Sequence, residues 1–278
     1  FTCFVDFKKA FDSVPRPVLW EVLGKAGVST RILNDIKAMY DKDTACVWTP
    51  DGLTDKFDCN IGVKQGCPLS PNLFGLYQDD LEKILLSVPN HDAPMLAGLA
   101  VPLLLYADDL ALISTSRGGL QRLLNELEAF CTVRGLTVNI DKTKVVVFGS
   151  RAAMKEPVTY NNVRIEQVIS FRYLGLELHQ SGTFQIAVAK LLESARRATF
   201  ALHSRCSALH IKDPKLKCSL FDALVYPIMA YGSEVWSPGT VIGEELEKWH
   251  RKFMRSILRL PSNSVCSMFY GELGRSPL

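Results

Sequence analysis

Residues 103–113 read LLLYADDLALI, a pattern from which much of the remaining architecture can be predicted. Two apolar runs of strand length flank Asp108 and Asp109, which stand side by side in a short turn. Short apolar runs bounded by turns are typical of strands buried on both faces. We therefore predict a β-hairpin with two buried strands and an acidic tip, whose charges need cations to balance them. Because exposed Asp-Asp turns are common, the hairpin alone does not define a site.

A second acidic position follows an apolar run at the start of the chain, where residues 1–12 read FTCFVDFKKAFD. Asp6 ends the predicted strand, and Phe11 follows a few residues later. The end of a buried strand is a usual place for a functional carboxylate, although a solubilising Asp also stands there often. Taken alone, a strand end with a solubilising aspartate is the favoured explanation of this segment.

Two further segments place polar residues in loops beside regular structure. Residues 62–71 read GVKQGCPLSP, in which Gln65 stands in a glycine-flanked loop before a helix that we expect Ser70 to cap. Glycines let a backbone approach a ligand closely, although a plain loop and helix cap also explain this segment in part. Residues 135–144 read GLTVNIDKTK, and a solvated turn explains these charges equally well.

Composition narrows the classes of protein that fit. The chain has 278 residues, 47% of them apolar and 22% charged, which excludes wholesale disorder. Residues 1–150 hold 15 Lys and Arg against 18 Asp and Glu, whereas residues 151–278 hold 17 against 11. A basic C-terminal half suggests contact with a polyanion such as nucleic acid, but this excess is also ordinary for a protein surface.

Other features bear on the cellular compartment. The eight cysteines include no C-x-x-C pair and no zinc-like cluster, so we expect reduced thiols in an intracellular protein. No signal peptide is visible, and the longest apolar stretch, residues 93–107, is short for a membrane span and contains two prolines. We therefore expect a protein of the nucleus or cytoplasm that is neither secreted nor bound to a membrane.

The periodicity of apolar residues divides the chain into two parts. Strands mixed with helices are predicted over the first 180 residues, with helices at residues 13–26, 29–40 and 116–134. Helices alone are predicted after that, at residues 184–203, 214–236 and 244–260, with a kink at Pro227 in the second. This order predicts an α+β unit followed by a small helical unit.

The four segments described above, in this order, resemble motifs A, B, C and D of reverse transcriptases. Their forms (FVDFKKAFD, GVKQGCPLSP and YADD) resemble the non-LTR, LINE-type retrotransposon branch. Residues 170–175, SFRYLG, resemble the next block, E, in which a hairpin grips the primer. Residues 220–236 and 270–278 resemble the thumb and the segment after it. The resemblance covers nearly the whole chain.

The resemblance implies a polymerase fold, an antiparallel palm sheet with packed helices followed by a helical thumb. Residues 1–180 would form the palm with partial fingers and motifs A to E. Residues 181–260 would form the thumb, and residues 261–278 would start a further C-terminal segment. In such enzymes most of the fingers lie upstream of motif A, in the same polyprotein. We therefore expect the fragment to be inactive alone.

The implied activity is that of an RNA-directed DNA polymerase, which adds dNTPs to a DNA primer on an RNA template. Two Mg²⁺ ions about 4 Å apart, or Mn²⁺ in their place, stabilise the attacking and leaving oxygens in such a transfer. By resemblance, Asp6 and Asp108 are the metal ligands, Asp109 supports them, and the carbonyl of Phe7 joins the coordination.

The resemblance also implies roles for residues around the metals. Phe11 would lie under the sugar of the incoming nucleotide and exclude a 2′-hydroxyl. Gln65 and Gly66 would contact the template or the nascent pair. Lys142, with Lys144 as the second choice, would protonate the leaving pyrophosphate.

Two other functions are compatible with parts of this sequence. A non-catalytic remnant of a retroelement could bind only RNA or a protein, and the three aspartates do not exclude it. An RNA-dependent RNA polymerase shares the palm, but Phe11 disfavours it because a ribonucleotide enzyme needs a small or polar residue there.

Overall fold

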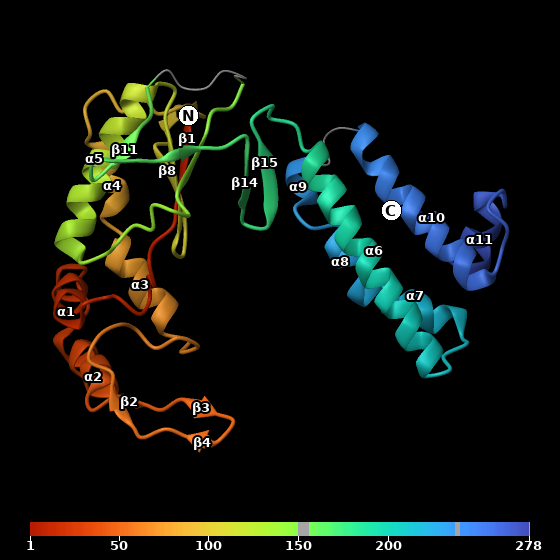
Figure 1. The fold of residues 1–278 in the computed structure, drawn as a ribbon, viewed down its shortest axis with the longest axis horizontal. Helices are drawn as coiled ribbons and strands as arrows, with labels where there is room; N and C mark the ends of the chain where they lie inside the picture. The colour runs from red at the N-terminus through yellow and green to blue at the C-terminus, as the bar shows by residue number, and fades with distance from the viewer. Residues whose placement is uncertain (150–155, 237–239, 278) are drawn as a thin grey trace. The chain divides into compact units, whose positions relative to one another are not determined.

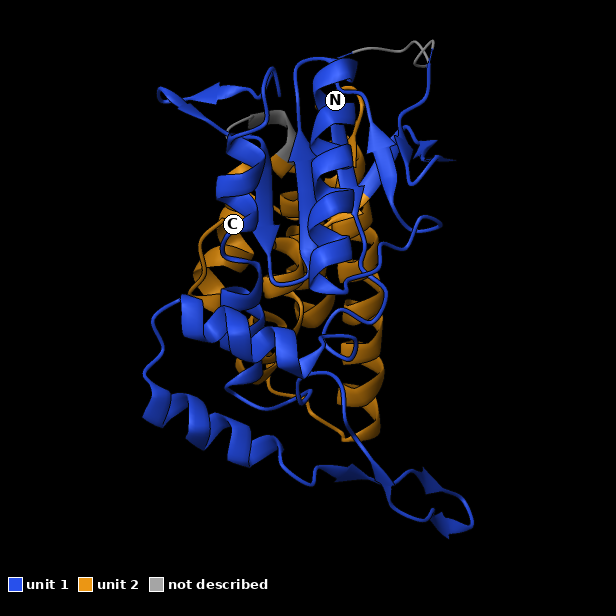
Figure 2. Ribbon diagram, turned by 90° about the vertical axis from the view of Figure 1, so that its left-hand side faces the viewer, with its two compact units in different colours: residues 1–171 blue, residues 172–278 orange. Residues whose placement is uncertain are grey.

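The computed structural model describes residues 1–149, 156–236 and 240–277. The chain divides into two compact units, residues 1–171 and residues 172–278, which are coloured separately in Figure 2. The first unit mixes strands and helices, and the second is mainly helical, which confirms the predicted α+β class. The division falls at residue 171 rather than at residue 180, where the sequence had placed it.

A five-stranded sheet forms the centre of unit 1, in the order β13-β10-β1-β9-β8. β1 lies between β9 and β10, and both pairings are antiparallel, as is the pairing of β8 with β9. The pairing of β10 with β13 is parallel. The prediction of an antiparallel sheet is therefore correct for the other strand pairs and wrong for this one. The strands are β1 (Thr2–Val5), β8 (Leu103–Tyr106), β9 (Asp109–Ile113), β10 (Lys144–Val146) and β13 (Glu166–Gln167).

The alternation of side chains along β1 explains why this strand is central. Cys3 and Val5 belong to the main hydrophobic core. Phe4 points to the opposite face, where its ring stacks on Phe171 with the centroids 4.5 Å apart. Both faces of β1 are therefore buried, because successive side chains of a strand point to opposite faces.

The hairpin of β8 and β9 is buried along β9 but on β8 only at Leu103, which corrects the prediction of two buried strands. On β9, Leu110 and Leu112 are fully buried. On β8, Leu104 and Leu105 are 47% and 40% exposed. β8 is the edge strand of the sheet and has a neighbour on one side only, which an apolar run in the sequence cannot reveal.

Helices pack against this sheet, and Figure 1 shows α4 and α5 lying side by side along it. The apolar stripe predicted for residues 116–134 is confirmed, since Leu120, Leu123 and Leu127 are fully buried. Each buried leucine contributes about 1.5–3 kcal/mol of transfer free energy. The helices are α1 (Arg16–Lys25), α2 (Thr30–Tyr40), α3 (Ser70–Gln78), α4 (Leu81–Leu86) and α5 (Arg117–Arg134).

The predicted ends of these helices are partly correct. The Ser116 hydroxyl accepts the Gly119 amide at the start of α5, and Gly135 ends the helix with φ of +67°. Ser70, however, does not cap α3, because it is the first residue of that helix and its side chain is buried against the Tyr40 hydroxyl.

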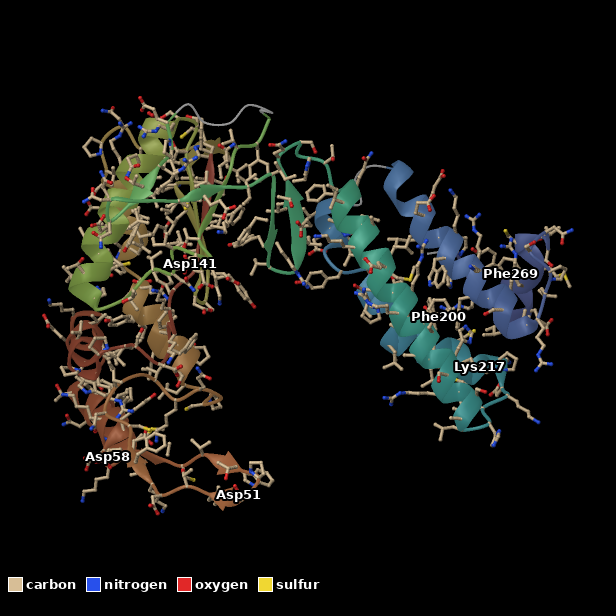
Figure 3. The ribbon with its side chains drawn as sticks, viewed as in Figure 1. Asp51, Asp58, Asp141, Phe200, Lys217 and Phe269 are labelled. Carbon is tan, nitrogen blue, oxygen red and sulfur yellow. The ribbon has the colours of Figure 1, made fainter. Side chains whose placement is uncertain are left out.

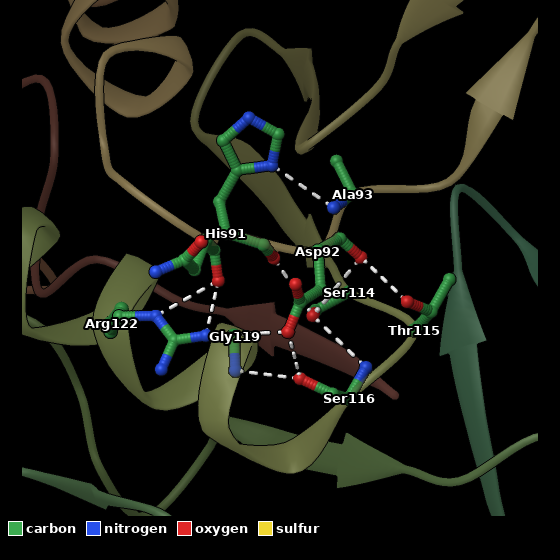
Figure 4. A network of polar contacts seen from close by, with 9 residues as sticks. His91, Asp92, Ala93, Ser114, Thr115, Ser116, Gly119 and Arg122 are labelled. Atoms are coloured by element: carbon green, nitrogen blue, oxygen red, sulfur yellow. Dashed lines mark hydrogen bonds and ion pairs between the residues drawn. The ribbon is translucent and has the colours of Figure 1, made fainter.

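A polar network shown in Figure 4 fastens the loop of residues 91–93 to the end of β9 and the start of α5. The Ser114 and Thr115 hydroxyls both donate to the carbonyl of Asp92. The Asp92 carboxylate accepts from the Ser116 hydroxyl and pairs with Arg122. Asp92 has φ of +49°, a left-handed conformation that these contacts hold in place.

Several short two-stranded ribbons project from unit 1, and Figure 3 labels Asp51 and Asp58 on two of them. The ribbons are β2 (Thr44–Ala45) with β5 (Phe57–Asp58), β3 (Trp48–Thr49) with β4 (Gly52–Leu53), β6 (Met95–Leu96) with β7 (Leu99–Ala100) and β11 (Thr159–Tyr160) with β12 (Val163–Arg164).

Unit 2 has a helical core, and the hairpin before its helices starts two residues ahead of the unit boundary. The predicted helix over residues 214–236 is broken into α7, α8 and α9, and Pro227 lies in the first turn of α8 rather than at a kink. The elements are the hairpin strands β14 (Ser170–Tyr173) and β15 (Leu176–His179), then α6 (Gln185–Ala208), α7 (Pro214–Leu224), α8 (Tyr226–Met229), α9 (Ser233–Trp236), α10 (Thr240–Leu258) and α11 (Cys266–Leu273).

Both ends of unit 2 differ from the predicted boundaries for a packing reason. The Tyr231 hydroxyl donates to the carbonyl of Leu174 at 2.6 Å, and its ring covers Gly175, so the hairpin turn packs with the helices. At the other end Phe269 of α11, labelled in Figure 3, is fully buried in the same core. Residues 261–277 are therefore part of this unit and not the start of a separate segment.

Among the described residues, no helix is both long and apolar enough to span a bilayer.

Protonation of His250 should destabilise unit 2. This imidazole is fully buried against the Phe221 ring, and burial lowers its pKa. Glu247 and Asp222 oppose this shift and Arg275 adds to it. The unfolded chain binds the proton more readily than the folded chain. The free energy of unfolding should therefore be constant above pH 6.5, the ordinary pKa of histidine, and should decrease as the pH drops below 6.5, by up to about 1.4 kcal/mol per pH unit.

The measurement is amide hydrogen exchange of α10 between pH 7.5 and pH 5.5, with intrinsic exchange rates corrected. In the His250→Phe variant, which keeps an aromatic ring against Phe221, the loss of protection at low pH should shrink. An equal loss in both proteins would show that other groups cause the acid sensitivity.

Candidate functional site

The acidic residues predicted from the sequence lie at one end of the central sheet. Val5 of β1 pairs with Leu110 of β9 in antiparallel register. Asp6 follows Val5 and Asp109 precedes Leu110, so the two aspartates extend neighbouring strands in the same direction. Asp108 lies in the two-residue turn before Asp109. Backbone pairing thus brings together residues that are far apart in the sequence.

The charges of these groups act on one another. The pKa of Asp109 is raised, first by partial burial and then by the negative charges of Asp108 and Asp6. Like charges held close together raise a carboxyl pKa because ionisation of one opposes ionisation of the next. The end of the sheet is therefore a concentration of negative charge that favours a bound cation.

The arrangement is open and does not form a closed metal cage. Within residues 1–149, 156–236 and 240–277, no three or more His, Cys, Asp or Glu side chains are grouped closely enough to hold a metal ion. The Asp6 carboxylate instead lies 4.0 Å from the ammonium of Lys142. This donor set fits Mg²⁺, which is held by one or two carboxylates together with water and substrate phosphates, and does not fit a closed structural site.

The turn that carries Asp108 is strained. Ala107 has φ of +53°, in the left-handed region that costs an alanine about 1–2 kcal/mol. The side-chain amide of Gln78, which is buried in α3, donates to the Ala107 carbonyl at 3.3 Å. This contact from a helix to a turn fixes the orientation of the acidic tip. Retained strain of this kind is typical of functional sites.

Backbone contacts fix Asp6 at the end of β1. Its amide donates to the Thr143 hydroxyl at 3.2 Å, and its carbonyl accepts the Asn139 amide at 2.7 Å. Phe7 is buried and bridges to Val138. The segment with Lys142 is thereby tied to the strand that ends in Asp6, although it lies in another part of the sequence.

The structure distinguishes between the two candidate lysines. Lys142 is 70% exposed and faces Asp6, so its ammonium is available at the acidic site. Lys144 pairs with Glu166 at 2.6 Å across β10 and β13 and is 21% exposed. Lys144 therefore forms an ion pair between two strands of the sheet, whereas Lys142 is the lysine that lies near Asp6.

Phe11 and Gln65 lie in two segments that contact each other through neighbouring residues. Phe11 is half-buried, and its ring stacks on Phe74 of α3 with the centroids 4.6 Å apart. The exposed amide of Gln65 donates to the Asp12 carboxylate at 2.9 Å. Gly66 follows with φ of +78°, a conformation that suits glycine. The structure therefore joins the predicted motif A and motif B segments.

Sequence reasoning did not identify three polar residues that shape this site. Gln78 holds the acidic turn, Thr143 holds Asp6, and Asp12 holds Gln65. Gln78 and Thr143 are each at most 1% exposed. A polar residue at a buried position of an otherwise apolar face is a usable signal, since such groups must be hydrogen-bonded. Asp12 is an ordinary acid in the sequence and gives no such signal.

A separate surface on unit 2 combines aromatic rings with cations. The Trp249 ring lies within 5.3 Å of the Arg196 guanidinium and 5.1 Å of the Lys252 ammonium. Phe200, labelled in Figure 3, meets this ring edge-on and is 65% exposed. Cations alternating with exposed rings are typical of surfaces that bind single-stranded nucleic acid.

Removing one charge from the acidic tip should stabilise the folded chain. Because the pKa of Asp109 is raised in the folded chain, its carboxyl group favours folding most when it is protonated at low pH. This contribution to the free energy of unfolding is lost as the pH rises through the raised pKa. Asp109→Asn should therefore raise the thermal midpoint at pH 7 by about 1–3 °C, since Asp109 is mostly solvent-exposed and its repulsion is screened. The check is calorimetry at pH 7 and pH 4, with the gain vanishing at the lower pH. A lower midpoint at pH 7 would contradict the repulsion.

Comparison with known proteins gives a consistent result. The profile of the family described as "Reverse transcriptase (RNA-dependent DNA polymerase)" matches residues 1–178. The R2 retrotransposon polyprotein of Popillia japonica is 27% identical over 97% of this chain and 38% of its own length. The jockey RNA-directed DNA polymerase of Drosophila funebris is 28% identical over 83% of this chain and 26% of its own length. The chain thus spans well under half of these relatives.

A solved structure with a related fold is the telomerase of Candida albicans. It covers 98% of this chain and 48% of its own length, with a TM-score of 0.50 and 15% identity. The likeness concerns the fold alone. The profile match covers more than half of the chain, and the relatives are retrotransposon enzymes. The chain therefore belongs to the reverse transcriptase family, the RNA-dependent DNA polymerases, and within it to the non-LTR, LINE-type retrotransposon branch.

Proposed function

We propose that this chain is the polymerase core of a retrotransposon enzyme that adds dNTPs to a primer 3′-hydroxyl on an RNA template. One observation carries the proposal, the antiparallel register of β1 and β9 that sets Asp6 beside the Asp108–Asp109 turn. In this arrangement unit 1 acts as the palm and unit 2 as the thumb.

The acidic tip would hold the metal ions of the reaction. Asp6 and Asp108 are the proposed Mg²⁺ ligands, Asp109 supports them, and the Phe7 carbonyl completes the protein's share; Mn²⁺ can replace Mg²⁺. Bound there, two divalent ions neutralise the charge that develops on the attacking and leaving oxygens. Water and the substrate phosphates would supply the remaining ligands, as is usual for Mg²⁺.

Lys142 is the proposed proton donor to the leaving pyrophosphate. Its ammonium lies 4.0 Å from the Asp6 carboxylate, beside the place where the phosphates would bind. A donor must be within reach of the group that it protonates, and the exposed four-carbon side chain of Lys142 can move over that distance.

Phe11 and the loop of residues 62–66 would select the nucleotide. The Phe11 ring, supported by Phe74, would lie under the sugar and leave no room for a 2′-hydroxyl. Gln65 and Gly66 would contact the template base or the nascent pair. The hydrogen bond between Gln65 and Asp12 supports a shared role, because it joins the two selecting segments.

Nucleic-acid binding has further support in unit 2. Its part of the sequence holds the excess of Lys and Arg, and its surface carries the cluster of Arg196, Phe200, Trp249 and Lys252. The related telomerase of Candida albicans was solved with a fragment of telomeric RNA. We propose an RNA template and a DNA primer as the partners of this chain.

The decisive experiment is extension of a DNA primer on an RNA template by the full-length protein that contains this chain. With Mg²⁺ and dNTPs we expect extension that falls at least 1,000-fold, about 4 kcal/mol, in Asp108→Ala. Asp35→Ala on the exposed surface of α2 is the matched control and should keep full activity. Absence of extension in the native protein, combined with intact RNA binding, would favour a non-catalytic remnant.

Phe11→Ala should relax the choice of sugar. Truncation opens space for a 2′-hydroxyl, so incorporation of ribonucleotides should rise while that of deoxynucleotides falls modestly. The measurement is the ratio of kcat/KM for a dNTP and its rNTP. Phe74→Leu, which alters the support of the ring, should change the ratio less. An unchanged ratio in Phe11→Ala would show that the ring serves only in packing against Phe74.

A further inference from the structure

We propose that Arg16 is a positioning residue for the loop of residues 62–66, and through this loop for Gln65. Arg16 lies in the first turn of α1 and is itself far from the acidic tip in sequence. The inference rests on the proposed function, since Gln65 acts there on the template or nascent pair. It adds a residue that touches no substrate and yet determines where Gln65 stands.

The Arg16 guanidinium makes directional contacts on three sides. Its Nε donates to the Gly62 carbonyl at 3.0 Å. One terminal nitrogen donates to the Tyr40 carbonyl at 3.2 Å, and the other pairs with the Asp43 carboxylate at 3.0 Å. The guanidinium carbon also lies 4.8 Å from the centroid of the Tyr40 ring. The start of the loop is thereby connected to α1 and to the end of α2.

This arrangement needs an arginine in particular. The side chain is only 10% exposed, and a buried cation is tolerated only where its donors are satisfied. A planar guanidinium directs its N–H groups outward in a fixed fork, which suits partners that lie in different directions. A lysine ammonium is a point charge on a flexible chain and cannot reach the Gly62, Tyr40 and Asp43 oxygens together.

The same partners hold the middle of the loop. Asp43 also pairs with the Lys64 ammonium at 3.2 Å, and that ammonium donates to the Met39 carbonyl at 2.9 Å. The Lys64 ammonium lies 5.4 Å from the centroid of the Tyr40 ring, so this ring makes a cation–π contact with Lys64 as well as with Arg16. Arg16 fixes both of these partners through its contacts with the Tyr40 carbonyl and the Asp43 carboxylate. Loss of Arg16 therefore releases the ring and the carboxylate that hold Lys64.

The other edge of the loop is fixed to the segment after Phe11. The Gly62 amide donates to the Val14 carbonyl, and the Val63 amide donates to the Phe11 carbonyl. A Cβ at Gly62 would lie 2.6 Å from the Asp12 carbonyl oxygen, so only glycine permits this approach. Gln65 then reaches the Asp12 carboxylate.

Two opposed sets of contacts therefore define the loop conformation. Gly62 and Gly66 both have positive φ, and glycines give a loop many alternatives when nothing holds it. Arg16 holds one side, and the Phe11–Asp12 backbone holds the other. Gln65 should be preorganised only while both sides of the loop are held. The loop would thereby couple Phe11, proposed to contact the sugar, to Gln65, proposed to contact the template or nascent pair.

A readout independent of catalysis is trypsin cleavage after Lys64 in the full-length protein, located by mass spectrometry. Cleavage requires the Lys64 side chain to leave Asp43 and Met39 and enter the protease. We expect Arg16→Met and Arg16→Lys to speed cleavage at this bond at least 10-fold. Lys25→Met, on the exposed side of α1, is the matched control and should not change it. Equal cleavage in all four proteins would overturn the proposal.

The second readout is the discrimination between correct and mismatched dNTPs, measured as the ratio of their kcat/KM values. Arg16→Met should lower this ratio about 10-fold, mainly through KM for the correct dNTP. If Arg16→Met fails to fold, Arg16→Lys, which keeps the positive charge, decides by the same ratio, and Asp12 variants test the opposite side of the loop. Asp12→Ala removes the acceptor of Gln65 and should lower the ratio, whereas Asp12→Asn keeps a side-chain oxygen and should restore it.

These two measurements separate the inference from the function on which it rests. Faster cleavage in a protein that polymerises nothing would support the anchoring role and contradict the polymerase. Unchanged cleavage and discrimination in an active polymerase would contradict the role of Arg16 alone.

Discussion

The pairing of β1 with β9 is the constraint on which the site depends. It joins the start of the chain to a hairpin that lies far away in the sequence, and its register fixes which residues extend beyond the paired strands. The polar end of the sheet exists because both strands leave the core at aspartates. A shift of the register by one residue would reverse the facing of every side chain on β1, so burial of Cys3 and Val5 enforces it.

The residues around that end are held by hydrogen bonds from other elements. A helix fixes the acidic turn through Gln78, and a loop fixes Asp6 through Thr143. Gln65 is held by Asp12, the residue that follows Phe11. Phosphoryl transfer depends on positioning and charge stabilisation more than on reactive side chains. Buried polar supports of this kind would therefore matter to the proposed site as much as the carboxylates.

The two units are stabilised by different types of contact. Unit 1 is built on non-local strand pairing, with short ribbons at its margins. Unit 2 is built on helix packing around Phe221, Phe253 and Phe269. Its hairpin joins it because Tyr231 binds the turn at Leu174, a contact between residues that no local pattern connects. The boundary between the units follows from these contacts and not from the change in secondary structure.

The sequence by itself determined the α+β class and the family, because apolar periodicity and ordered motifs are local properties. It also determined α5 with its cap and its C-terminal glycine. Only the tertiary structure decided that β8 is an exposed edge, that Lys144 pairs with Glu166, and that residues 261–277 belong to unit 2. Burial at an edge, the choice of an ion-pair partner and the docking of a last helix depend on distant neighbours, which periodicity along one chain does not encode.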